Sequence, residues 1–408
     1  MKSTHTLTKL AVVAAGLLFF SSCSKKEDTG LTNIMQYRNE SSQAETIDAT
    51  TITSDMTLED KVNGVDYIIS NNIQVNANLI IKPGVTVMFK KDAGIQVNES
   101  GSLTAIGASG NMVLFTSESG KRGDWKGITI LSNSARNVIS YCKIEHGGGA
   151  NEFGTGDLVI GSQTNTGEAV VDHNEITASA TDGIVLSEGS KLNGFISNKI
   201  HTNTACPISM HITDAGNMAD GNEFVNNGKE FIKVSGDGRN VITKEISLNH
   251  LSESFLVNGT IVAGNKFSIA AGSRVYMNGG AEVVVDGIAG HGTFNAVGTA
   301  ASPITIAATY NGNGLWNTIR FRSSDSNENQ IEYCTISGGG ANTNANAEGM
   351  ISVTNDGGGS SNIVIRHSSI INSGAIGIYI ESAGSEYNSD IISGNEFSNN
   401  VKGNVHIE

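Results

Sequence analysis

Three segments spaced 24 residues apart decide the fold of this chain: Asn174-Glu175-Ile176, Asn198-Lys199-Ile200 and Asn222-Glu223-Phe224. Each of them places an asparagine two positions before a large apolar residue. Short β-branched and aliphatic runs such as Gly183-Ile184-Val185-Leu186 occur between them, and Gly, Asn, Asp or Ser interrupts each run. Short strands separated by turns, at a fixed period in the low twenties, are typical of the coils of a β-solenoid.

A single coil of three short strands cannot bury its inward side chains, so neighbouring coils must stack. Stacked parallel strands lie about 4.8 Å apart, and we expect Ile176, Ile200 and Phe224 to form one interior column. An asparagine at the same corner of each coil can hydrogen-bond to the backbone of the next coil. A pair of β-sandwiches is an alternative that leaves the 24-residue period unexplained, and the consensus of leucine-rich repeats is absent.

A longer repeat shows that the coil region is duplicated. Tyr141-Cys142-Lys143-Ile144 matches Tyr333-Cys334-Thr335-Ile336, and Trp125 matches Trp316. We therefore predict an all-β chain, a parallel β-helix in two tandem copies. Copy 1 spans residues 49–236 and holds one extra coil of 24 residues, and copy 2 spans residues 237–408.

The composition of the 408-residue chain fits this fold and excludes one class of partner. Glycine is abundant (49) and proline rare (3), as many tight turns with left-handed backbone require. The formal net charge of −14 argues against nucleic acid, because phosphate binding needs a basic surface.

The N-terminus carries an export signal. Lys2 and Lys9 precede an apolar segment of 11 residues, 10–20, so residues 1–22 are predicted to be a signal peptide. Ser21-Ser22-Cys23 resembles a lipobox, although Phe20 stands where leucine is usual. We expect Cys23 to be acylated and to anchor the protein in the membrane. The alternative is a cleaved secretory signal with an incidental cysteine.

Residues 23–48 are polar and are predicted to form a flexible tether. Within them, Ser24-Lys25-Lys26-Glu27-Asp28 is similar to the surface-export signal of Bacteroidetes lipoproteins, or is a plain charged linker. The predicted location is the outer membrane, lipid-anchored, at the cell surface, with the periplasmic face as the alternative.

Several motifs carry a family resemblance. They are Leu79-Ile80-Ile81-Lys82-Pro83-Gly84, Gly123-Asp124-Trp125-Lys126-Gly127 and Tyr141-Cys142-Lys143-Ile144-Glu145-His146. Their order resembles the secreted right-handed parallel β-helix proteins common in Bacteroidetes, over about residues 49–408. The resemblance implies a right-handed coil, the fold of pectate lyases and polygalacturonases, and an extracytoplasmic location. It implies no particular chemistry, since many members of the group have no assigned activity.

The densest group of titratable residues lies in copy 1. Asp172, His173 and Glu175 fall on one coil, next to the coil that carries Glu145 and His146. Such a group could hold a cation such as Ca²⁺ or serve as an acid and a base. Outward, solvated side chains are the plainer interpretation.

Copy 2 has Arg366 and His367 at the position of Asp172 and His173, and this pair could bind an anionic sugar. Each copy also has a Gly-rich insertion, at 147–167 and 338–362, and Asp157 lies in the first of them. Loops that leave a rigid scaffold often carry function.

Other features are expected to be structural. Gly290-His291-Gly292 lacks the remaining polygalacturonase motifs and is interpreted as a turn. Trp125 and Trp316 either cover a core corner or stack on sugar rings. Cys142, Cys206 and Cys334 are expected to be buried thiols, because coils in different copies lie beyond disulfide reach.

Three functions are compatible with the sequence. The first is a non-catalytic envelope lipoprotein that binds a polysaccharide or cell-surface glycan, or mediates adhesion, with no dedicated cofactor. The second is a polysaccharide lyase or glycoside hydrolase. The third is a purely structural envelope protein.

Overall fold

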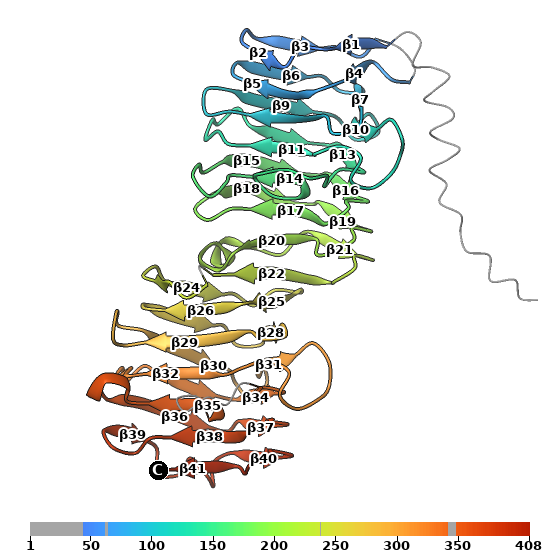
Figure 1. The fold of residues 1–408 in the computed structure, drawn as a ribbon. Coiled ribbons are helices and arrows are strands. Elements are labelled where there is room, and N and C mark those ends of the chain that lie inside the picture. The colour runs from blue at the N-terminus through green and yellow to red at the C-terminus, as the bar shows by residue number, and fades with distance from the viewer. Residues whose placement is uncertain (1–43, 62–63, 237, 342–347) are drawn as a thin grey trace, which may run out of the picture.

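The chain forms a long stack of β-coils in which every sheet is parallel (Figure 1). This computed structural model describes residues 44–61, 64–236, 238–341 and 348–408. Its strands follow one another around the coil and pair with strands of the coils above and below. The predicted fold class, an all-β right-handed parallel β-helix in two tandem copies, is confirmed. The signal peptide and Cys23 lie outside the described residues.

Three sheets, A, B and C, surround the upper coil. Sheet A contains β1 (Glu45–Ile47), β4 (Tyr67–Ile69), β7 (Thr86–Phe89), β10 (Val113–Ser117), β13 (Cys142–Glu145), β16 (Glu175–Thr177), β19 (Lys199–His201) and β21 (Glu223–Val225). Sheet C contains β3 (Met56–Leu58), β6 (Asn78–Ile81), β9 (Ser102–Ile106), β12 (Val138–Ser140), β15 (Glu168–Asp172) and β18 (Lys191–Ile196). The first strand, β1, lies within the last residues of the predicted tether.

Sheet B runs through both copies. Its upper part contains β2 (Thr51–Ile52), β5 (Asn72–Val75), β8 (Gly94–Val97), β11 (Ile128–Ile130), β14 (Gly156–Ile160), β17 (Asp182–Leu186), β20 (Ile208–His211) and β22 (Phe231–Ser235). Its lower part contains β25 (Ser254–Asn258), β28 (Arg274–Met277), β31 (Ile304–Ala308), β34 (Cys334–Ser337), β37 (Ser369–Ile371) and β40 (Glu396–Ser398).

Two further sheets, D and E, complete the lower coil. Sheet D contains β23 (Val241–Ile242), β26 (Thr260–Ala263), β29 (Glu282–Asp286), β32 (Ile319–Arg322), β35 (Gly349–Thr354), β38 (Ile376–Ile380) and β41 (Val405–Ile407). Sheet E contains β24 (Ile246–Leu248), β27 (Lys266–Ile269), β30 (Thr293–Val297), β33 (Gln330–Glu332), β36 (Ser361–Arg366) and β39 (Ser385–Tyr387). In the described part of the chain, two short 3₁₀ helices, η2 (Ile212–Asn217) and η3 (Asp356–Gly358), interrupt the strands. Among the described residues, no helix has the length and apolarity needed to span a membrane.

The interior is a column of apolar side chains, as the 24-residue period predicts. Ile176 pairs with Ile200, and Ile200 pairs with Phe224. Both isoleucines are fully buried, and Phe224 packs against the same core from the last strand of sheet A. The side chains of successive coils therefore lie directly over one another.

A ladder of asparagines satisfies the backbone at one corner of the coil. The amide N–H of Asn174 donates to Oδ1 of Asn198 at 3.1 Å, and that of Asn198 donates to Oδ1 of Asn222 at 3.1 Å. Nδ2 of Asn198 donates to the carbonyl oxygen of Val171 at 2.9 Å. Each side chain thus pairs backbone groups that would otherwise be buried without a partner.

Sheets that are equivalent in the two copies do not lie directly over one another. Tyr67-Ile68-Ile69 in sheet A is the sequence equivalent of Phe255-Leu256-Val257, which forms β25 in sheet B. In the structure β25 pairs with β22, with Lys233 opposite Leu256. The second face of copy 1 therefore continues as the first face of copy 2, and the lower coil is displaced sideways from the upper one (Figure 1).

The helix η2 makes this sideways step possible. It follows β20, where sheet C would need its next strand, and it buries Ile212 and Ala215. Strand β24 of copy 2 packs against it. Polar contacts also cross the junction: Lys244 Nζ lies 2.6 Å from Glu188 Oε1, and Nδ2 of Asn249 donates to the carbonyl oxygen of Gly216 at 2.8 Å.

We predict that Asn198→Ala lowers the free energy of unfolding by about 2–3 kcal/mol, because it leaves the Asn174 amide and the Val171 carbonyl unpaired in the interior. Urea denaturation followed by circular dichroism measures the change. Asn193→Ala, at an exposed position of the same coil, is the matched control. Equal stability of the two variants would contradict a structural role for the ladder.

Candidate functional site

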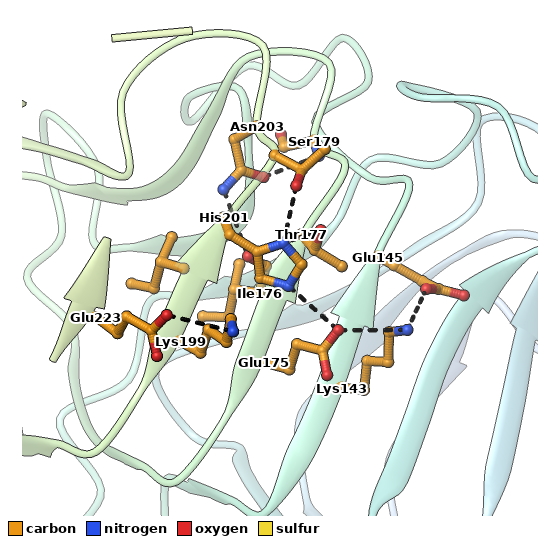
Figure 2. A network of polar contacts seen from close by, with 12 residues as sticks. Lys143, Glu145, Glu175, Ile176, Thr177, Ser179, Lys199, His201, Asn203 and Glu223 are labelled. Atoms are coloured by element: carbon orange, nitrogen blue, oxygen red, sulfur yellow. Dashed lines mark hydrogen bonds and ion pairs between the residues drawn. The ribbon is translucent and has the colours of Figure 1, made fainter. Parts of the chain in front are cut away.

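The outward face of sheet A carries a row of alternating charges (Figure 2). We call this row, Lys143, Glu175, Lys199 and Glu223, the charge ladder. Lys143 Nζ lies 3.4 Å from Glu175 Oε1 and 3.0 Å from Glu145 Oε2, and Lys199 Nζ lies 3.3 Å from Glu223 Oε1. The acids that the sequence singles out on this face are therefore paired with lysines.

His201 joins the ladder from the next coil and was missed in the sequence. Its Nε2 lies 3.2 Å from Glu175 Oε1, and its Nδ1 lies 2.8 Å from Thr202 Oγ1. The hydrogen bond between His201 and Glu175, together with the positive charge of Lys143, lowers the pKa of Glu175 to about 2. Glu175 is thus an ionised, fixed carboxylate at neutral pH. The 24-residue period could have found His201, since it pairs directly with Thr177.

Glu145 and His146 lie at the end of β13. Oε1 of Glu145 accepts a hydrogen bond from Thr116 Oγ1 at 2.8 Å, and the glutamate side chain is 15% exposed. His146 has left-handed backbone with φ of 68°, and its Nδ1 lies 3.7 Å from Glu145 Oε1. Gly338 holds the same left-handed position in copy 2, with φ of 83°. This pair is therefore anchored locally and faces solvent only in part.

Asp157 is removed from solvent entirely. It is the second residue of β14 and is 0% exposed. Its carboxyl group lies beside Gly147 and Trp125, and neither oxygen accepts a well-formed hydrogen bond. Burial raises the pKa of Asp157 well above its usual range; the Gly147 amide partly offsets this, and the charge of Glu145 adds to it. The structure separates Asp157 from the charge ladder.

Copy 2 has a methionine where copy 1 has Asp157. Leu158 pairs with Ile128 in copy 1, and Ile351 pairs with Ile319 in copy 2, so Met350 is the counterpart of Asp157. Met350 is also fully buried, and its Sδ accepts the amide of Gly339 at 3.2 Å. An apolar side chain of similar reach therefore fits this corner.

A stacked pair of rings recurs at one corner of both copies. Tyr141 stacks on His173 with ring centroids 4.5 Å apart and planes 14° apart. Tyr333 stacks on His367 with centroids 4.7 Å apart and planes 15° apart. All four residues have left-handed backbone, with φ between 49° and 52°. We call these pairs platform 1 and platform 2.

Small residues stand at the corners above and below the platforms. Gly107 and Ser197 occupy the neighbouring corners in copy 1, and Gly298 and Gly394 do so in copy 2. Both histidines are exposed, and the side chain of His173 is 43% exposed. In copy 2 a surface groove of about 420 Å³ adjoins His367 and is lined by Ser368, Ser369, Ser393, Gly394, Asn395 and Glu396.

The charges beside the two platforms differ. In copy 1, Asp172 lies 3.5 Å from Nδ1 of His173 and accepts a hydrogen bond from Ser140. In copy 2, Arg366 occupies the place of Asp172, and its Nε lies 3.4 Å from Asp390 Oδ1. The structure therefore brings Asp172 and His173 together, and Arg366 and His367 together, around equivalent rings.

The remaining candidates are structural or only partly described. Trp125 and Trp316 are both fully buried, and each donates from Nε1 to a backbone carbonyl oxygen, that of Glu145 or Ser337. The three cysteines of the described residues are free and buried, as expected. Residues 342–347 of the second insertion lie outside the description.

No group of three or more His, Cys, Asp or Glu side chains among the described residues is arranged to hold a metal ion. The Ca²⁺ expectation stays a prediction. The chain matches no family model, and no curated protein or solved structure is significantly similar to it. Fold and surface together define an all-parallel β-helix protein with a ring platform at the equivalent corner of each copy.

We predict that Asp157→Met raises the free energy of unfolding by about 1–3 kcal/mol at pH 8, because a buried, poorly paired carboxyl is replaced by the side chain that copy 2 uses. The folded-state pKa is raised, so the wild-type carboxyl is tolerated at acidic pH and costs stability as the pH rises. The gain should therefore shrink at pH 4.

Thermal unfolding of Asp157→Met at both pH values measures this difference. Asp48→Met, at an exposed position, is the control and should change the unfolding temperature little at either pH. A destabilised Asp157→Met protein at pH 8 would show that the carboxyl makes a contact that methionine cannot replace.

Proposed function

We propose that this protein is a lipid-anchored outer-membrane protein that binds glycan at its two platforms without cleaving it. One observation supports this function above the others: both copies keep the stacked rings, while the candidate acids of copy 1 are replaced in copy 2. Arg366 stands in place of Asp172, Ser337 in place of Glu145 and Met350 in place of Asp157.

Ring stacking suits a carbohydrate ligand. The apolar face of a sugar ring packs on an aromatic face, and nearby polar groups bind its hydroxyls and fix its orientation. At platform 1 these groups are Asp172 and Ser140, and at platform 2 they are Arg366 and the serines of the adjoining groove.

Two of the candidate acids, Glu175 and Asp157, are poorly suited to catalysis. Glycoside hydrolysis needs two carboxyl groups, one of them protonated and within reach of the substrate. Glu175 is held ionised by His201 and Lys143, and Asp157, whose pKa is raised by burial, has no access to solvent. Binding without turnover is therefore the favoured function over a lyase or hydrolase.

The membrane location rests on the sequence. The signal peptide of residues 1–22 and the lipobox-like cysteine Cys23 support acylation and anchoring, and the resemblance of the coil motifs to secreted Bacteroidetes proteins supports the compartment. Exposure at the cell surface is the preferred orientation, and the periplasmic face is the alternative.

A glycan array, run with an assay for unsaturated uronates and new reducing ends, tests this function. We expect the mature protein to bind a subset of glycans without turnover. The double variant His173→Ala/His367→Ala should lose affinity at least about tenfold. His291→Ala, at an exposed turn, is the control and should bind as wild type.

Two outcomes would overturn the proposal. Turnover that is lost on His173→Ala would identify a lyase or hydrolase. A folded protein that neither binds nor cleaves any arrayed glycan would leave a structural role in the envelope.

A further inference from the structure

The continuous sheet B fixes the distance between the two platforms. Platform 1 precedes β13 and β16, and platform 2 precedes β34 and β37. From β14, which follows β13 in the same coil, to β34 the order of sheet B contains seven strand steps. At about 4.8 Å per step, the platforms lie about 34 Å apart along the stack.

The sideways step at the junction adds a lateral offset. Platform 1 lies where the strands of sheet A begin, and the lower strands of sheet B begin beneath the corner where sheet A ends. The offset is thus one strand with its corners, roughly 15–20 Å. In Figure 1, the strands of sheet A lie along the right edge of the upper coil, and the lower strands of sheet B lie along the right edge of the lower coil.

The sheet A part of the surface between the platforms is polar and nearly neutral. A line from platform 1 to platform 2 crosses the outward face of sheet A, where the charge ladder lies (Figure 2). Each lysine of the ladder is paired with a glutamate, so the ladder has little net charge. The whole chain is acidic, with a formal net charge of −14, which disfavours a polyanion.

We propose that the ligand is a long, linear, neutral polysaccharide, one chain of which occupies both platforms and crosses sheet A between them. This inference rests on the proposed glycan binding and goes beyond it by naming the class of glycan. A short oligosaccharide cannot reach from one platform to the other. A polymer can reach both platforms. Once it is bound at one platform, its binding at the other is intramolecular.

Rigid spacing makes the second contact effective. The strands of sheet B are hydrogen-bonded without a break across the junction, through β22 and β25. A linker that held the sites loosely would give less avidity, whereas matched sites can gain about 10²–10⁴ in affinity over one site.

The test uses tetrasaccharides and the matching soluble polymers of β-1,4-glucan, β-1,4-xylan and β-1,4-mannan, with polygalacturonate as the charged counterpart. Isothermal titration calorimetry with the mature protein measures affinity and stoichiometry. We expect at least one neutral polymer to bind about 100-fold more tightly than its tetrasaccharide. The tetrasaccharide should bind two sites per protein.

Single platform variants separate the possibilities. His173→Ala and His367→Ala should each reduce polymer affinity to that of the tetrasaccharide, and each should leave one tetrasaccharide site with unchanged affinity. His291→Ala should change neither value. The thermal unfolding temperature of each variant verifies that it is folded.

Contrary outcomes are distinguishable. Equal affinity for polymer and tetrasaccharide, or single variants that weaken polymer binding no more than about twofold, would refute the spanning chain and leave glycan binding intact. Binding of polygalacturonate alone would refute the neutral class. No binding of any probe by folded protein would overturn the spanning chain and the proposed function together.

Discussion

A three-residue strand has unpaired N–H and C=O groups on both edges, and it is stable only when other strands lie against it. In this protein each inner strand of a sheet is paired by the coils above and below, and this stacking requires that every corner also repeat in register. The asparagine ladder of residues 174, 198 and 222 meets that requirement, because each side chain bonds to the backbone of the neighbouring coil. The core columns and surface ladders follow from the same register.

This constraint also explains the junction between the copies. Where copy 1 ends, its last strands need new partners. Here β22 pairs with β25, and η2 takes the place of the next strand of sheet C. The equivalent faces of the two copies are consequently out of line by one side of the coil. Surface features that repeat in the sequence, such as Tyr141 with His173 and Tyr333 with His367, therefore have a defined separation and a defined offset.

The 24-residue period was sufficient to predict the coil, the column from Ile176 to Phe224 and the buried asparagines, because these depend only on register. The same period also aligns the outward residues of successive coils, and this alignment predicts that His201 lies near Glu175. The sideways step was not predictable, since matching Tyr67-Ile68-Ile69 to Phe255-Leu256-Val257 shows which strands are alike and not which edges meet. Asp157 lies within a Gly-rich insertion, so its burial near Trp125 depends on a corner geometry that its neighbours in sequence do not reveal.

Cross-linking across the junction tests the stacking most directly. Ser235 of β22 lies opposite Asn258 of β25, and the Cα atoms of paired parallel strands are within disulfide reach. The double variant Ser235→Cys/Asn258→Cys should form a disulfide on mild oxidation, detected by peptide mass spectrometry, while Val225→Cys/Asn258→Cys should stay reduced. The reverse result would mean that copy 2 continues beneath sheet A, and the shared sheet and the platform spacing would both be wrong.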